Sequence, residues 1–180
     1  MYGLIFMGLK KYIDANLGAN KWNNLLTNSG IGSKIYSYNS EYQDQEAVAL
    51  VSMVSKLTGK TVPAVLEEFG EFITPELFNM YRLLIKPEWR TLDLIEHTEE
   101  TIHKTVRMKN PGAKPPELKV SRLNPNEVVI TYSSQRKMCG IAKGIAKGVA
   151  KHYREQLSIV EPSCMLRGDA NCKISIKVAK

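Results

Sequence analysis

The sequence is poor in cysteine and histidine and has no long apolar run. Its three cysteines are an odd number in a chain of 180 residues, which argues against the disulfide framework of small secreted domains. No apolar run approaches the roughly 20 residues that a membrane-crossing helix needs. The apolar start, residues 1–9, has neither the basic beginning nor the cleavage site of a signal peptide. We therefore expect a cytoplasmic protein without membrane insertion, whose first segment enters the core.

The sequence also lacks the residue arrangements of common enzymes. It has no Ser-His-Asp arrangement, no phosphate-binding glycine loop and no pair of carboxylates for acid–base chemistry. No linker or low-complexity tract divides the chain, and its hydrophobic fraction of 43% is ordinary for a globular domain. We expect residues 1–180 to form one domain that is not an enzyme.

The formal net charge of +7 introduces nucleic-acid binding as an alternative. The lysines and arginines are spread along the chain, however, without a compact basic block, a zinc-finger motif or an RNA-binding motif. A solvated basic surface is the simpler interpretation, and such a surface also suits an acidic protein partner. We expect no nucleic-acid partner.

The first 110 residues have the pattern of helices. Apolar residues recur at helical spacing over Gln45–Leu57, and Gly59 is expected to end that helix. Thr61 is expected to cap a second helix, with Pro63 in its first turn, that runs towards Phe72. The segment Thr74-Pro75-Glu76 is expected to start a third helix. Thr91–Met108 is the fourth, and it ends before an Asn-Pro-Gly turn.

The pattern then changes from helical spacing to alternation. Leu118–Leu123 and Glu127–Tyr132 flank Asn124-Pro125-Asn126, which predicts a β-hairpin. The remaining predicted elements are a helix over Arg136–Leu157 and strands over Leu157–Val160 and Cys172–Val178. A helical half followed by a β-β-α-β-β half indicates the α+β class with an antiparallel sheet.

Three glycines recur every four residues in the last predicted helix, at Gly140, Gly144 and Gly148. Each costs on the order of 1 kcal/mol relative to alanine, so another element must approach closely. Packing of this helix on the sheet is the expected reason. A membrane dimer is excluded, because lysine returns every fourth residue as well.

One histidine lies at the edge of an apolar helical stripe. On the predicted fourth helix, His103 stands beside the stripe that includes Ile102 and Val106. Most histidines in such a place are core or boundary side chains with a hydrogen bond. The other interpretation is a ligand to a metal or to heme iron, because neutral imidazole is the commonest axial donor.

A second feature follows the predicted hairpin. Tyr132, Ser134 and Arg136 point the same way in an extended segment and set a phenol, a hydroxyl and a guanidinium in a row. Arginine's planar fork suits a carboxylate, which the two hydroxyls can also bind. Taken alone, such a triplet is more often a polar strand end. The pair Pro115-Pro116 is likewise an ordinary rigid connector when considered alone.

Together these features resemble the heme-nitric oxide/oxygen binding (H-NOX) domains, bacterial relatives of the heme domain of soluble guanylate cyclase. The helix histidine, the Pro-Pro pair, Tyr-x-Ser-x-Arg and the start Met1-Tyr2-Gly3-Leu4-Ile5 carry the resemblance, which covers essentially the whole chain. It implies that His103 is the proximal ligand of a heme b iron and that Pro116 presses on the porphyrin. The implied propionate-binding residues are Tyr132, Ser134 and Arg136. The candidates for the apolar walls are Ile5, Phe69, Ile73 and Ile141.

The resemblance also predicts which gas binds. Oxygen-binding members of the family have a distal tyrosine where this chain has Ile141, and a supporting polar residue where it has Ile73. Both positions are apolar, so the chain resembles the branch that binds nitric oxide and carbon monoxide, although Tyr81 remains an alternative donor. The implied response is that nitric oxide weakens the iron–His103 bond. The implied partner is a separate sensor histidine kinase or cyclic-di-GMP enzyme.

The cysteines are the last feature. Some H-NOX domains hold a structural zinc with three cysteines and a histidine, and the corresponding positions here are Cys139, Cys164, Cys172 and, in place of the histidine, Glu161. A redox-active disulfide and inert thiols are the other possibilities. A rival class is a non-heme small-molecule or cysteine-based redox module related to 4-vinyl reductase-type domains, which share the Cys-x7-Cys ending. Under that hypothesis neither His103 nor the Tyr132-x-Ser134-x-Arg136 motif has a role in binding heme.

Overall fold

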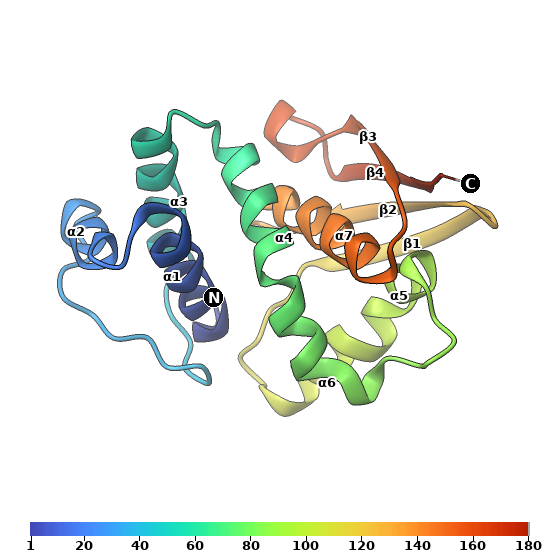
Figure 1. The fold of residues 1–180 in the computed structure, drawn as a ribbon, viewed down its shortest axis with the longest axis horizontal. Helices are drawn as coiled ribbons and strands as arrows, with labels where there is room; N and C mark the ends of the chain where they lie inside the picture. Colours follow the sequence, from blue (N-terminus) through green and yellow to red (C-terminus); the bar gives the residue numbers. More distant parts are fainter. Residues whose placement is uncertain (180) are drawn as a thin grey trace.

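The computed structural model describes residues 1–179, and Figure 1 shows a helical part beside a layered part that contains a sheet. The first helices are α1 (Gly3–Leu17), α2 (Lys21–Asn28), α3 (Asp44–Thr58) and α4 (Val62–Tyr81), followed by the 3-10 turn η1 (Arg82–Leu84). A second helical run comprises α5 (Thr91–Thr98), the π-helical turn η2 (Glu99–His103) and α6 (Lys104–Lys109). The strands and the last helices are β1 (Glu117–Asn124), β2 (Glu127–Ser133), α7 (Cys139–Tyr153), β3 (Leu157–Ser163), η3 (Met165–Arg167) and β4 (Cys172–Val178).

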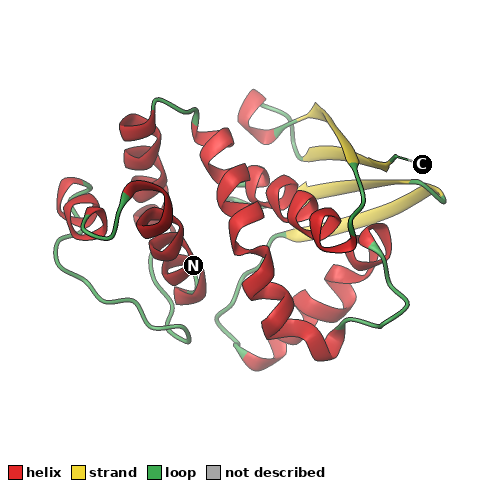
Figure 2. Ribbon diagram, viewed as in Figure 1, coloured by secondary structure: helices red, strands yellow, loops and turns green. Residues whose placement is uncertain are grey.

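The four strands form one antiparallel sheet in the order β1-β2-β4-β3. The predicted hairpin is present as β1 and β2, and Val128 and Ile130 of β2 are buried in register with Ile176 and Ile174 of β4. Helix α7 lies between α4 and this sheet (Figure 2). The α+β class and the antiparallel sheet are thereby confirmed.

Two helix boundaries follow the sequence signals. Helix α3 ends at Gly59, which adopts the left-handed conformation at φ +71° that glycine tolerates. At the start of α4, the Thr61 hydroxyl accepts a hydrogen bond from the Ala64 N–H at 3.4 Å, and Pro63 lies in the first turn. The expected helix over Thr91–Met108 is present as α5, η2 and α6.

The prediction that a third, separate helix starts at Thr74 is wrong, because α4 continues through Pro75. A proline inside a helix removes one backbone hydrogen bond and crowds the preceding turn. Packing outweighs this cost, since Phe69 and Ile73 are buried in the helical core and Thr74 is buried at the contact with α7. The Thr74 hydroxyl donates to the Gly70 carbonyl at 2.8 Å, which keeps this buried polar group satisfied.

The three α7 glycines face α4 rather than the sheet, which corrects the expected reason for them. A Cβ on Gly144 would lie 1.9 Å from the Glu67 carbonyl oxygen, and one on Gly148 would lie 2.4 Å from the Thr74 hydroxyl. The opposite face of α7, with Cys139 and Ala146, packs into the apolar cluster of the sheet. Glycine therefore lets α7 fit closely between α4 and the sheet.

Over residues 1–179, none of the helices combines the length and the apolar character that crossing a bilayer requires. The cytoplasmic location stays a prediction.

Candidate functional site

A mostly apolar cavity of about 290 Å³ lies between the helical part and the sheet. Its walls come from α1, α4, the run from α5 to α6, the segment before β1, the hairpin and α7. Helix α4 contributes Thr74, Leu77, Phe78 and Tyr81, which recur at helical spacing along one face. On α7, Ile145 and Val149 extend the wall that Ile141 begins. The cavity is suited to an apolar ligand with a few polar ends.

His103 lines this cavity from the end of η2. Its Nδ1 lies 2.9 Å from a carboxylate oxygen of Glu99, and its side chain is 15% exposed. Burial lowers the pKa of His103, although the Glu99 carboxylate opposes this change. The ring is therefore neutral at pH 7, and with Nδ1 engaged, Nε2 is the nitrogen left to bind a metal.

Glu99 was not singled out from the sequence. Burial opposes its ionisation, but Arg107 and His103 lower its pKa below the ordinary value. The signal that was available is its position four residues before His103, which places the two side chains on one face of a helix.

Tyr132 and Arg136 line the same cavity from β2 and the loop that follows it. Tyr132 is buried, and burial raises the pKa of its phenol to about 12, although a hydrogen bond with Ser134 opposes this change. Ser134 does not line the cavity, and its Oγ accepts from the Arg136 backbone N–H at 3.3 Å. At neutral pH the three side chains thus offer a phenol, a hydroxyl and a cation.

The Arg136 guanidinium belongs to a small network of charges at the cavity. It donates to the Asp44 carboxylate at 3.4 Å and also to the Lys114 carbonyl. The N-terminal amine of Met1 pairs with Asp44 at 2.8 Å. Burial opposes the ionisation of Asp44, but the amine and Arg136 lower its pKa below the ordinary value. Sequence patterns gave no sign of Asp44, because its partners are distant in the chain.

Among the residues expected to surround a heme, the wall candidates Ile5 and Ile141 line the cavity, as does Pro116. Phe69 and Ile73 do not, which corrects that expectation: both are buried in the helical core, and the Ile73 side chain packs against Gly8 of α1. Their face of α4 turns towards α1, whereas the face that begins at Thr74 turns towards the cavity.

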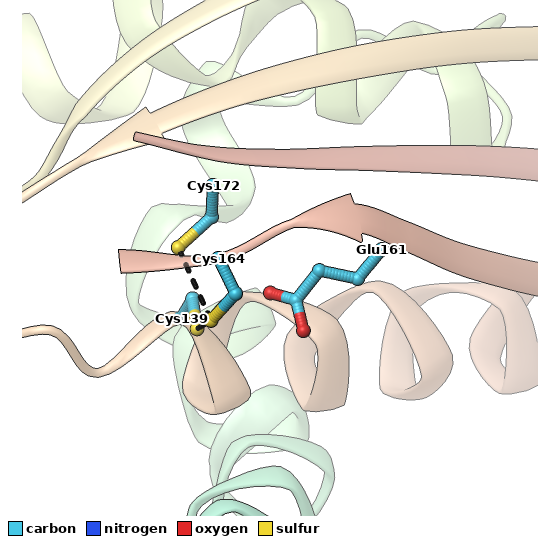
Figure 3. A group of neighbouring side chains, drawn as sticks. All are labelled: Cys139, Glu161, Cys164 and Cys172. Atoms are coloured by element: carbon cyan, nitrogen blue, oxygen red, sulfur yellow. Dashed lines mark hydrogen bonds between the residues drawn. The ribbon is translucent and has the colours of Figure 1, made fainter. Parts of the chain in front are cut away.

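The three cysteines and Glu161 come together where the start of α7, the end of β3 and the start of β4 meet (Figure 3). One potential ligand atom from each lies within 4.8 Å of the others. The sulfur atoms of Cys139 and Cys164 are 3.6 Å apart, and those of Cys164 and Cys172 are 3.7 Å apart. Burial raises the pKa of the Cys139 thiol well above its ordinary value, and the neighbouring thiols add to this effect.

Residues 2–161 match the sequence model of a family described as Haem-NO-binding. The chain belongs to this family. This confirms the resemblance to H-NOX domains, which are heme-based gas sensors rather than enzymes. No curated protein matches this H-NOX sequence significantly.

Solved H-NOX structures share the fold. An H-NOX protein from S. oneidensis in the Fe(II)NO ligation state has a TM-score of 0.93 at 24% identity, with 100% of both chains covered. The unliganded Fe(II) H-NOX protein from K. algicida has a TM-score of 0.87 at 19% identity, over 100% of this chain and 97% of that one. A mutant of T. tengcongensis H-NOX has a TM-score of 0.85 at 22% identity, over 100% of this chain and 98% of that one.

Proposed function

We propose that the chain is a ferrous-heme nitric oxide sensor in which His103 is the iron ligand and Arg136, Tyr132 and Ser134 bind the propionates. The observation that carries this proposal is that a neutral imidazole and a guanidinium line one apolar cavity from separate elements. A heme has the matching properties: an iron that takes imidazole, a large apolar ring and two carboxylates. Ferrous heme supplies an iron atom that binds a diatomic gas.

Each polar residue has a distinct role under this proposal. Arg136 offsets the charge of a buried propionate, which is costly to desolvate without a cation. Its five N–H donors exceed what Asp44 and the Lys114 carbonyl use, so it has donors left for a ligand. Tyr132 stays protonated at neutral pH and can donate its hydroxyl proton. Pro116 makes one wall beside His103 rigid.

We further propose that nitric oxide and carbon monoxide bind in preference to dioxygen. Dioxygen gains from a hydrogen-bond donor near the iron, whereas the other two gases need one much less. Ile141 and Ile145 of α7 are apolar, and the Thr74 hydroxyl is already engaged with the Gly70 carbonyl. Tyr81 lines the cavity and remains the alternative donor.

His103 stands at the start of the signalling step. When nitric oxide binds, we propose that the bond from His103 to the iron weakens, which frees the run from α5 to α6 to move. A two-state element of this kind is what a switch needs. The output would then pass to a separate sensor histidine kinase or cyclic-di-GMP enzyme. Addition of the protein in its reduced and nitric oxide-bound states to such a partner tests this step, through the difference in the partner's activity.

The visible absorption spectrum tests the central proposal. Purified protein expressed with adequate heme should show a Soret band that changes on reduction and again with nitric oxide. His103→Gly should abolish or greatly weaken heme binding, and imidazole should restore it. Absence of a Soret band in the parent protein would refute the proposal and would favour the non-heme alternative.

A structural zinc ion is a second candidate ligand, at Cys139, Cys164, Cys172 and Glu161. These donors suit zinc, and the Glu161 Oε1 atom is buried without a hydrogen-bond partner among the described residues. Lys143, 3.1 Å from Glu161, offsets part of the negative charge. The alternatives are inert thiols and a disulfide between two of the cysteines, which oxidation would form as a second input. Metal analysis tests this: zinc should be present in the parent and lost in Cys172→Ala.

A further inference from the structure

Glu99 makes a direct polar contact with the proposed iron ligand, His103. Its carboxylate oxygen Oε2 lies 2.9 Å from Nδ1 of His103, within the same π-helical turn. Single π-helical turns occur frequently at functional sites. The contact joins the ring nitrogen on the side away from the proposed iron bond, so it can influence the ligand without touching the heme.

The Glu99 carboxylate is itself held in place from two sides. Its Oε2 accepts a hydrogen bond from the Leu118 backbone N–H at 3.2 Å, and Arg107 donates to its Oε1. The side chain is 19% exposed, so water competes only weakly for these bonds. A cation and an N–H group stabilise the ionised form. His103 therefore faces a fixed negative charge rather than a mobile surface side chain.

The hydrogen bond has two consequences for an imidazole that binds iron. It requires the proton to be on Nδ1, which leaves the Nε2 lone pair for the metal. An ionised acceptor also draws the Nδ1 proton more strongly than a neutral one, which makes the ring a stronger electron donor. A hydrogen bond with the Pro116 backbone also raises the pKa of His103, but its effect is smaller than that of Glu99 and its acceptor is neutral.

We propose that Glu99 is a positioning residue that fixes the tautomer of His103 and strengthens its bond to the heme iron, which raises the resistance of that bond to rupture by nitric oxide. This inference rests on the proposed function. A purely structural role is the rival, because Glu99 also joins α6 to β1 through Arg107 and Leu118. A useful test must therefore measure the iron–histidine bond itself.

Resonance Raman spectroscopy of the reduced, heme-loaded protein makes that measurement. Glu99→Gln keeps the size of the side chain and removes its charge. We expect the iron–histidine stretching frequency to fall, and the ratio of five- to six-coordinate nitric oxide complex to rise by about tenfold, the lower end of second-shell effects on metal sites. Glu99→Asp retains the charge and should lie between the parent and Glu99→Gln. The control is Glu100→Gln, because Glu100 is the exposed neighbour on the same turn.

The outcomes separate this inference from the function on which it rests. If the parent has no Soret band, the proposed heme function and the role of Glu99 both fail. If the parent and the variants bind heme but Glu99→Gln has the stretching frequency of Glu100→Gln, only the role of Glu99 is overturned. If Glu99→Gln does not fold, a measurement on the unmutated protein still tests the role of Glu99. In the diamagnetic carbon monoxide complex, NMR should detect a strongly hydrogen-bonded Nδ1 proton on His103, and its absence overturns the inference.

Discussion

The close contact between α4 and α7 predicts a large effect of a very small substitution. In Gly144→Ala the new methyl carbon would lie 1.9 Å from the carbonyl oxygen of Glu67 and 2.8 Å from the backbone nitrogen of Glu71. Both atoms belong to the backbone of a helix, so no side-chain rotation relieves the overlap. A methyl carbon normally stays about 3.5 Å from atoms to which it is not bonded. The two helices must therefore separate locally by roughly 1 Å or more.

The expected stability change combines two opposing effects. Alanine favours the helix by about 1 kcal/mol relative to glycine. Overpacking of a close-packed contact costs about 1–3 kcal/mol, and the clash with backbone places Gly144→Ala at the upper end. We expect a net loss of about 1–2 kcal/mol in the free energy of unfolding. Because both helices line the cavity, retention of heme should also decrease.

Urea unfolding, monitored by circular dichroism on matched samples with heme, measures this change. Lys151→Ala is the control on the same helix, because the Lys151 side chain is 80% exposed and its replacement should change stability by no more than about 0.5 kcal/mol. An increase in stability for Gly144→Ala would mean that the helix preference alone decides. That result would refute the close packing of α4 on α7.

Three further substitutions test the cavity and its charges. Arg136→Leu removes the cation proposed for the propionates, so heme should transfer faster to an apo-globin acceptor, measured from the Soret band. Ile141→Tyr adds a donor where oxygen-binding relatives have one, and should produce an oxygenated spectrum in air that the parent lacks; such a spectrum in the parent would contradict its gas preference. The pKa of Asp44 is lowered, so its ion pairs stabilise the fold above the ordinary carboxyl pKa of about 4 and lose this effect as the pH falls through the lowered value. In Asp44→Asn, urea unfolding over this pH range should therefore depend less on pH.

The sequence predicted those elements whose signals are local. Gly59 ends α3 and Thr61 caps α4 because left-handed backbone and a capping hydroxyl are requirements of neighbouring residues. The hairpin of β1 and β2 follows in the same way from alternation around a Pro-Asn turn. The alternation from Tyr132 to Arg136 predicted an extended segment, but β2 ends at Ser133 and the chain turns at Ser134, where the Lys137 N–H donates to the Ser134 carbonyl. Tyr132 and Arg136 line the cavity, whereas Ser134 does not.

The errors arose where tertiary packing decides. Pro75 is a helix breaker by local rules, yet the burial of α4 against α1 and α7 keeps the helix continuous. Phe69 and Ile73 are as apolar as the true wall residues, so composition alone does not tell which face of α4 meets the cavity. The π-helical turn and the pairing of Asp44 with Arg136 have no local signature at all. They depend on contacts with segments far away in the chain.

The contacts around His103 also indicate which part of the molecule is free to transmit a signal. The helical run that carries His103 is joined to β1 by polar bonds: Glu99 to the Leu118 N–H, and Arg122 to Asp93 and Glu96 at 2.8 and 2.7 Å. The opposite wall consists of α4 and α7, whose backbones are in close contact at the α7 glycines. These two helices cannot slide past each other without steric overlap. Partly exposed ion pairs rearrange at low cost, whereas close-packed helices do not. A change at His103 should therefore move α5 and α6 relative to the sheet and to the α4–α7 pair, and a partner protein that reads the heme state should contact these two helices.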